Sequence, residues 1–265
     1  MTLLSVDRLT VAFRRYRGLI DRVDIDCLAD LTLDVGRGEV VALFGASGAG
    51  KSLFAHAVLG LLPGNAMVTG SIRFEGERLD ARRIAALRGR RIALVPQSLS
   101  HLDPLATIGR QIAWAARRAG RRGFAQGDAA AALDRFGLDG SVLASYPHRL
   151  SGGMARRVML AIASVGDADL IVADEPTNGL DPDNAEKVFG FLRGFADEGK
   201  VVVVISHDLA AAVASADRVV VLRDGALVAV ESAATFRNGG EGLSPYARAL
   251  WRALPQHAFL GAAHA

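Results

Sequence analysis

The segment Gly45-Ala46-Ser47-Gly48-Ala49-Gly50-Lys51-Ser52 matches the pattern G-x-x-x-x-G-K-[ST], which is typical of a loop that wraps around phosphate groups. A short apolar run at 40–44 has the character of a buried strand, and a helix-prone segment follows at 53–60. Glycines lack a Cβ, so successive backbone N–H groups can turn towards one anion, and the helix N-terminus adds partial positive charge. The sequence therefore predicts a nucleotide-binding core.

Two side chains of this loop have specific expected tasks. Lys51 is expected to reach the β- and γ-phosphates, and the Ser52 hydroxyl is expected to ligate Mg²⁺. The chain has only three lysines, Lys51, Lys187 and Lys200, which disfavours a stray lysine in a glycine-rich turn. The residues expected to surround the nucleotide here are Gly45, Ser47, Gly48, Ala49, Gly50, Lys51, Ser52 and Leu53.

Composition narrows the class of protein. The chain has 265 residues, 51% of them hydrophobic and 22% charged, which indicates an ordered globular protein with a sizeable core. Cys27 is the only cysteine, so an intrachain disulfide and a cysteine-based metal cluster are excluded. The N-terminus lacks the layout of a secretory signal, and no apolar run approaches the roughly 18–20 residues that span a bilayer. We therefore expect a cytosolic protein that meets a membrane only through a partner.

Strand-like and helix-like segments alternate along the chain, which predicts an α/β fold with a mainly parallel sheet and helices on both faces. The expected strands are 3–13, 31–35, 40–44, 71–75, 92–95, 170–173, 201–206 and 219–222. Residues 98–165 are rich in alanine and arginine and predict an inserted α-helical subdomain. We expect one cassette over 1–265, with a core at 1–97 and 166–230 and a C-terminal tail at 231–265.

Two carboxylates follow one of the apolar strands. Asp174 and Glu175 come directly after residues 170–173, at the carboxyl edge of a parallel sheet, where ligands of such folds collect. Asp174 is expected to share Mg²⁺ with Ser52. Glu175 is then placed to polarise a water molecule as general base.

A second candidate anion site lies at Leu150-Ser151-Gly152-Gly153, before a segment of good helix formers. Ser151 has the character of an N-cap residue, and the glycines free the backbone at the helix start. One nucleotide-binding domain needs only one phosphate-binding loop, so this second site is more than ATP binding by a single domain requires.

Taken together, these motifs resemble those of the nucleotide-binding subunit of ABC transporters. Three further elements agree in family order: Gln97 matches the Q-loop glutamine, Gly179-Leu180-Asp181 matches the D-loop, and His207 matches the switch histidine. The resemblance covers nearly the whole chain. It implies a P-loop NTPase core with an N-terminal antiparallel β part and an inserted helical subdomain.

The resemblance also implies a mechanism. Ser151, Gly152 and Gly153 of one subunit would close on ATP held by the P-loop of another, in a head-to-tail dimer. Glu175 would be the catalytic base, and His207 would hold the γ-phosphate and the water in line. Gln97 would contact Mg²⁺ and link the site to the membrane partner, and Asp181 would communicate across the dimer. Adenine would stack on Phe13, with Tyr16 second, although either aromatic is equally compatible with a structural strand residue.

Several segments resemble the oligopeptide, dipeptide and nickel importer branch. They are Tyr-Pro-His-Arg at 146–149, Met154 after the signature, and 244–250 followed by Leu-Pro at 254–255, with Ser244, Ala247 and Arg156 as departures. The segment 256–259 and the single cysteine favour a nickel-like metal or metal–metallophore cargo, with di- or oligopeptides as the alternative.

The implied partners are a second ATPase subunit, expected to be a paralogue, two membrane permease subunits and an extracytoplasmic solute-binding protein. The expected location is the cytoplasmic face of the inner membrane. Adjacent arginines such as Arg117-Arg118 leave a soluble ATPase acting on nucleic acid as a remote alternative, and we expect no nucleic-acid partner.

Overall fold

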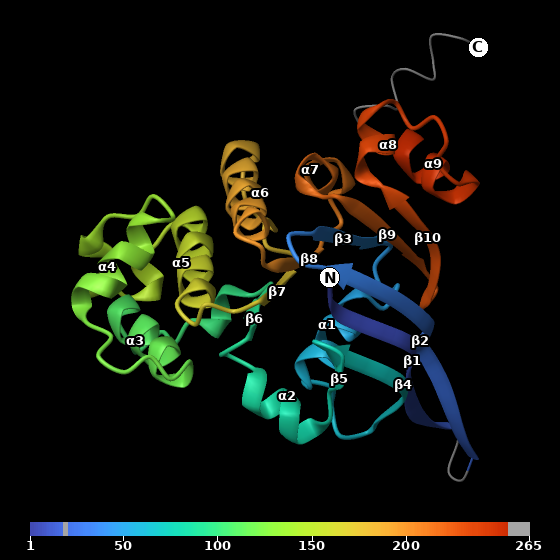
Figure 1. Ribbon diagram of the computed structural model, residues 1–265, viewed down its shortest axis with the longest axis horizontal. Coiled ribbons are helices and arrows are strands. Elements are labelled where there is room, and N and C mark those ends of the chain that lie inside the picture. The colour runs from blue at the N-terminus through green and yellow to red at the C-terminus, as the bar shows by residue number, and fades with distance from the viewer. Residues whose placement is uncertain (18–20, 254–265) are drawn as a thin grey trace.

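The computed structural model describes residues 1–17 and 21–253, and it describes side chains outside 15–23. The tail segments 254–255 and 256–259, on which part of the cargo prediction depends, lie outside the described residues. A large sheet occupies one side of the molecule, and helices α3, α4 and α5 gather at the other end (Figure 1). No helix of the described ranges is both long enough and apolar enough to span a lipid bilayer.

One continuous sheet runs through the described residues. Its strand order is β5-β4-β1-β2-β10-β9-β3-β8-β7-β6. The strands are β1 Thr2–Arg17, β2 Asp21–Gly36, β3 Val40–Gly45, β4 Ala66–Phe74, β5 Glu77–Arg78, β6 Ile92–Val95, β7 Leu170–Asp174, β8 Val201–Ile205, β9 Arg218–Arg223 and β10 Ala226–Ser232. The block β9-β3-β8-β7-β6 is parallel, whereas β5, β4, β1 and β2 pair antiparallel. This arrangement matches the predicted fold class.

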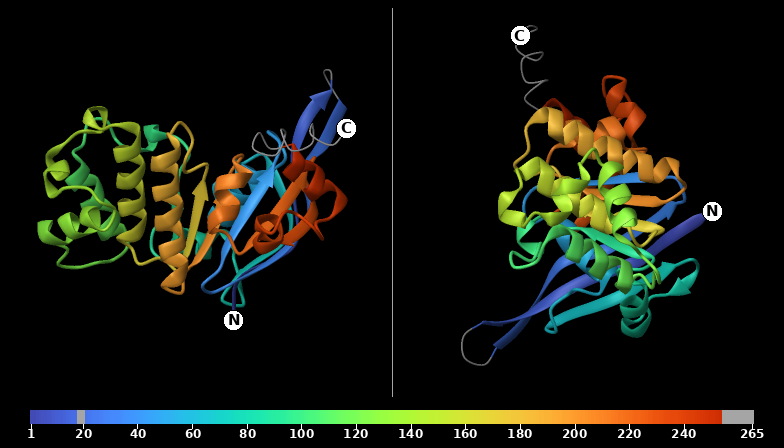
Figure 2. Two further views of the ribbon diagram at one scale, coloured as in Figure 1. Left: turned by 90° about the horizontal axis from the view of Figure 1, so that it is seen from above. Right: turned by 90° about the vertical axis from the view of Figure 1, so that its left-hand side faces the viewer.

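The helices of the described residues cover the two faces of the parallel block. They are α1 Lys51–Leu59, α2 Ala81–Leu87, α3 Ile108–Arg118, α4 Gln126–Asp134, α5 Gly152–Ser164, α6 Pro182–Asp197, α7 Leu209–Ser215, α8 Ala233–Arg237 and α9 Pro245–Arg252. Short 3₁₀ turns lie at Leu99–His101, Gly140–Ala144 and Pro147–Arg149. Seen from above, α5 and α6 lie side by side, with the parallel strands on one side of them and α3 and α4 on the other (Figure 2).

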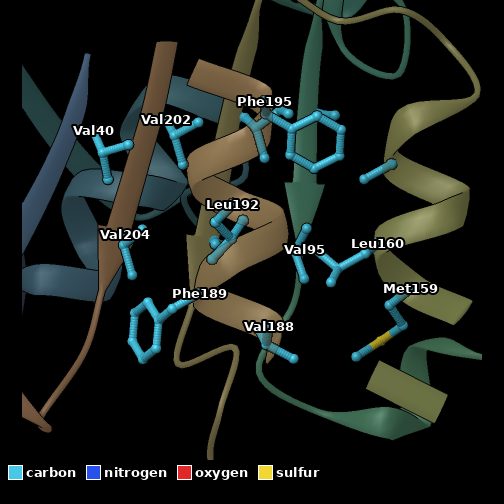
Figure 3. Packing of buried hydrophobic residues seen from close by; sticks show 14 of the residues in the cluster. Val40, Val95, Met159, Leu160, Val188, Phe189, Leu192, Phe195, Val202 and Val204 are labelled. Atoms are coloured by element: carbon cyan, nitrogen blue, oxygen red, sulfur yellow. The ribbon is translucent and has the colours of Figure 1, made fainter. Parts of the chain in front are cut away.

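The parallel strands separate two hydrophobic cores because their side chains alternate between faces. Val202 and Val204 of β8 pack with Leu192 in the core beneath α5 and α6, as Figure 3 shows. Val203 packs in the opposite core with Phe54 of α1 and the antiparallel strands. Strand β8 is buried along its whole length, which explains its nearly continuous valine sequence.

The strand order brings the predicted site together. Four strands of the parallel block lead into predicted site residues: β3 into the P-loop, β8 towards His207, β7 into Glu175 and β6 towards Gln97. Because parallel strands end at the same edge of a sheet, these segments meet there. The pairing of Asp174 with Ile205, and of Leu43 with Ile205, sets their relative height.

Some strand bounds differ from the prediction. Strand β2 begins at Asp21, about ten residues before the expected start, and pairs with β1 in a long hairpin. Polar residues mask this strand in the sequence: Asp24, for example, pairs with Arg14 across the hairpin at 3.0 Å. Strand β10 was not expected, and it joins the two parts of the sheet through one parallel pairing of Ala226 with Ala29.

Candidate functional site

The P-loop connects β3 to α1, and its three glycines are required for different reasons. A Cβ on Gly45 would lie 2.4 Å from the Leu222 carbonyl oxygen of the neighbouring strand β9. Gly50 has φ of +94°, and a Cβ there would lie 2.8 Å from the Cys27 carbonyl oxygen. Gly48 has φ of +81°, and a Cβ added to it would meet no atom of the described chain within 4 Å. Two glycines therefore allow close backbone packing, whereas Gly48 leaves open space beside the loop.

Lys51 is the first residue of α1, and its side chain curls back over the loop. Its Nζ donates hydrogen bonds to the carbonyl oxygens of Gly45, at 2.7 Å, and Ala46, at 3.1 Å. The residue is 8% exposed, and burial lowers the pKa of its ammonium group while Glu175 and Asp174 oppose this shift. The loop thus holds a buried cation, which favours an anionic ligand.

Ser52 and Asp174 face each other between α1 and the end of β7. The Ser52 hydroxyl donates a hydrogen bond to Asp174 Oδ1 at 3.3 Å. Asp174 is 7% exposed, and burial raises the pKa of its carboxyl group, with further repulsion from Glu175. A hydroxyl and a buried carboxylate are oxygen ligands of the kind that Mg²⁺ takes alongside water and substrate phosphates, so these residues fit the ion. Within the described residues no cluster of three or more His, Cys, Asp or Glu side chains is arranged to hold a metal alone.

Glu175 and His207 form a close pair at the same edge. His207 Nδ1 lies 2.5 Å from Glu175 Oε2, and the His207 backbone N–H donates to the same oxygen at 3.3 Å. Glu175 has φ of +47°, a left-handed conformation that costs a non-glycine residue free energy and often marks functional sites. Asp208, and not His207, caps helix α7 by accepting a hydrogen bond from Ala211 N–H. The histidine ring is therefore available to the site.

These groups enclose a cavity of about 480 Å³ at the carboxyl edge of the sheet. The lining residues are Ser47, Gly48, Ala49, Gly50, Lys51, Ser52, Leu53, Gln97, Glu175 and His207. All of them belong to the set of residues predicted from the sequence. Gln97 approaches from the loop after β6, and so from a different strand than Glu175 and His207.

The signature residues are not among those that line this cavity. Ser151 caps α5 by accepting a hydrogen bond from Met154 N–H at 3.2 Å, and both Ser151 and Gly152 are exposed. A Cβ on Gly153 would lie 3.1 Å from the side chain of Asn184, at the start of α6. The second glycine-rich helix start is therefore open to a molecule outside this chain.

Asp181 and Phe13 also lie apart from the cavity lining. Asp181 is the N-cap of α6 and accepts hydrogen bonds from Asn184, which lower the pKa of its carboxyl group. Phe13 lies on β1 opposite Ile25 and Ala66, and it packs partly against the core that contains α1. The side chain of Tyr16 lies outside the described residues, so the choice between the two aromatics stays a prediction.

Two residues near the site were not assigned a role from sequence. Asn184 contacts both Gly153 and Asp181, and its only signal in the sequence is the capping spacing from Asp181. Arg156 is 5% exposed and reaches main-chain atoms beside the cavity. The sequence analysis singles out Arg156 only as a departure from the pattern of the oligopeptide, dipeptide and nickel importer branch.

The geometry supports phosphate chemistry. Backbone N–H groups of the loop and the Lys51 ammonium can neutralise phosphate oxygens, while Ser52 and Asp174 can hold a divalent cation. Glu175 lies on the cavity wall, where a carboxylate can orient an attacking water. This set of groups is suited to hydrolysis of a nucleoside triphosphate.

Comparison with known sequences agrees with this chemistry. A family model described as "ABC transporter" matches residues 28–178. A putative peptide import ATP-binding protein of Brucella abortus is 38% identical over 263 residues, which cover 96% of this chain and 77% of the relative. The oligopeptide transport ATP-binding protein OppD of Lactococcus lactis is 35% identical over 264 residues, which cover 96% of this chain and 76% of the relative.

Solved structures show the same fold. A dimeric post-hydrolysis state of the ATP-binding cassette MJ0796, bound to ADP and Pi, matches with a TM-score of 0.76 at 26% identity, over 87% of this chain and 99% of that chain. An ATP-binding subunit of an ABC transporter matches with a TM-score of 0.73 at 28% identity, over 94% of this chain and 98% of that chain. The chain belongs to the ABC transporter family, as an ATP-binding subunit that hydrolyses ATP.

Proposed function

We propose that this chain powers an importer of di- or oligopeptides by hydrolysing ATP in the cavity around Lys51. The observation that carries the proposal is the convergence of Lys51, Gln97, Glu175 and His207 on one cavity of about 480 Å³. The names of the relatives, which are import proteins for peptides and oligopeptides, support a peptide cargo over the metal cargo that the tail segment favoured. That segment lies outside the described residues, so it lends the metal interpretation no structural support.

We assign each of these residues a role that its position supports. Lys51 neutralises the β- and γ-phosphates, and Ser52 and Asp174, with Gln97 nearby, hold Mg²⁺. The ion supplies charge neutralisation on the phosphate oxygens. Glu175 accepts the proton of the attacking water, and His207 keeps the Glu175 carboxylate aligned through their 2.5 Å contact.

We propose that the surplus helix start at Ser151, Gly152 and Gly153 completes the ATP site of a second subunit. Its exposure in this chain, and its absence from the cavity lining, support a head-to-tail arrangement. Asp181 and Phe13 then act at the dimer contact and at adenine. The second subunit is a paralogue or another copy of this chain.

The remaining partners and the division of the chain are proposals that rest on the family. We propose two membrane permease subunits, an extracytoplasmic solute-binding protein and a location at the cytoplasmic face of the inner membrane. The proposed division assigns 1–97 and 166–230 to the core, 98–165 to a helical subdomain and 231–265 to the tail. The grouping of α3 and α4 away from the sheet, joined to it through α5, supports this division (Figure 1).

The substitution Glu175→Gln tests the site. We expect ATP hydrolysis to fall by about 10²- to 10⁴-fold, because general-base assistance is lost, while affinity for a fluorescent ATP analogue stays unchanged. The matched control is Glu186→Gln, which neutralises an exposed glutamate on α6. Hydrolysis by Glu175→Gln at the wild-type rate would remove Glu175 from the role of base.

Uptake by cells tests the cargo. A strain that lacks this chain should lose uptake of a labelled tripeptide and regain it with the wild-type chain but not with Glu175→Gln. Uptake of radioactive nickel should be the same in all these strains. Loss of nickel uptake with intact peptide uptake would instead favour the metal interpretation.

A further inference from the structure

Arg156 is a buried charge beside the proposed ATP site whose role the mechanism above leaves open. It lies on the second turn of α5, three residues after Gly153, and it is 5% exposed. Within the described residues Arg156 forms no ion pair with a carboxylate, and burial alone lowers the pKa of its guanidinium. Burying a charge without a counter-charge is costly, so an apolar residue would fill this space at a lower cost.

The guanidinium joins three parts of the chain. Its Nη1 donates a hydrogen bond to the Pro96 carbonyl oxygen at 3.0 Å, and its Nη2 donates one to the Asn178 carbonyl oxygen at 3.2 Å. Pro96 directly precedes Gln97, which lines the cavity. Asn178 closes the turn that starts at Glu175, because its N–H donates to the Glu175 carbonyl oxygen at 3.2 Å. One side chain of α5 therefore holds, through hydrogen bonds, the backbone next to Gln97 and the backbone of the turn after Glu175, two residues that line the cavity.

The next residue shows that this arrangement is particular to Arg156. Arg157 lies on the same helix, but its Nη1 donates to the carbonyl oxygens of Phe136 and Gly137, at 3.3 and 3.0 Å. Both of these acceptors belong to the helical end of the molecule. A planar guanidinium with fixed donor directions orients its acceptors more strictly than a flexible amine or amide does.

We propose that Arg156 is a positioning residue that ties the Gln97 loop and the turn after Glu175 to helix α5. When a second subunit's nucleotide binds at the α5 N-terminus, displacement of the helix is then passed to both cavity walls of this chain. The inference rests on the proposed function, because it takes Gln97 and Glu175 as working residues of ATP hydrolysis.

Kinetics of the transporter assembled with its membrane subunits test this proposal. We expect Arg156→Gln to lower kcat by tenfold or more, with KM for ATP within twofold of wild type, because the P-loop contacts are untouched. Arg156→Lys should recover part of kcat, since an ammonium keeps the charge and reaches one of the two carbonyls. Arg237→Gln is the matched control: it removes a guanidinium that donates to the backbone carbonyls of Val213 and Ala216 at the end of α7, and none of these three residues lines the cavity.

Hydrogen exchange supplies a readout that does not depend on activity. In Arg156→Gln, the backbone amides of Val95, Gln97 and Ser98 and those of 177–180 should exchange at least tenfold faster, while those of β8 stay as in the wild type. The proposal is overturned if Arg156→Gln keeps kcat within twofold, or if nucleotide affinity falls in step with kcat. Measuring Glu175→Gln in parallel separates the proposed function from the proposed role of Arg156. Hydrolysis by Glu175→Gln at the wild-type rate refutes the proposed function. An inactive Glu175→Gln together with a fully active Arg156→Gln refutes only the role of Arg156.

Discussion

The P-loop glycines provide a test of why the loop has this sequence. A Cβ on Gly45 would lie 2.4 Å from the Leu222 carbonyl oxygen, more than 1 Å short of the optimal separation of about 3.5 Å. The Leu222 carbonyl oxygen belongs to the backbone of the paired strand β9, so no change of side-chain rotamer relieves the clash. Overpacking costs typically about 1–3 kcal/mol and occasionally more. We therefore expect Gly45→Ala to lose about 3 kcal/mol or more of unfolding free energy.

Gly48→Ala should affect ATP binding more than the stability of the fold. A side chain in the left-handed region costs about 1–2 kcal/mol, and no atom of the described chain crowds the new methyl group. The methyl group would instead occupy space beside the cavity where phosphate is expected. We expect only a small loss of stability but a loss of ATP affinity of tenfold or more.

Thermal unfolding and binding of a fluorescent ATP analogue measure both effects. At roughly 2–4 °C per kcal/mol, Gly45→Ala should lower Tm by about 6–12 °C and Gly48→Ala by about 2–8 °C. Gly64→Ala is the control, because its Cβ would meet nothing within 4 Å and its φ is not positive. A Gly45→Ala protein that melts within 2 °C of wild type, or a Gly48→Ala protein with wild-type affinity, would refute the reasoning.

Two further substitutions probe charge and packing. Because burial raises the pKa of Asp174, its ionised form lowers the stability of the folded protein above that pKa, and the cost disappears as pH falls through it. Asp174→Asn should therefore raise the Tm of the nucleotide-free protein by a few degrees at pH 8 and by less at pH 4, and it should abolish the extra stabilisation by MgATP; a lower Tm at pH 8 would contradict this. Phe136 is 1% exposed, and its ring centroid lies 5.0 Å from that of Phe191 and 5.9 Å from that of Phe195. Phe136→Ala should therefore lower the free energy of unfolding in urea by about 3–5 kcal/mol. A loss below about 1 kcal/mol would show that the packing of α6 against the helical end does not depend on this contact.

Much of the site could be predicted because its residues follow strands of one parallel block. The sequence locates the ends of β3, β7 and β8, and parallel pairing then brings Lys51, Glu175 and His207 to one edge. The periodicity of buried strands is strong there, since β7 and β8 are buried along their length. Local pattern and topology agree, which makes this region easy to predict.

Other features depend on contacts that local sequence does not encode. The early start of β2 is masked by acidic residues such as Asp24, whose partner Arg14 is supplied by another strand. The 2.4 Å approach of Leu222 to a Cβ on Gly45 depends on which strand lies next to β3. The acceptors of Arg156 come from two loops far along the chain, so its role has no sequence pattern. The cargo prediction rested on the segment 256–259 and the single cysteine, and the names of the relatives favour peptides instead.

The central claim is that the cavity around Lys51 is half of an ATP site that a second subunit completes. The most direct test is the specific rate of MgATP hydrolysis as a function of protein concentration, with the association state followed by sedimentation. The account predicts that activity per chain rises with concentration in parallel with the dimer, whether the second subunit is a copy or an added paralogue. Full activity per chain at concentrations where only monomer is present would contradict it.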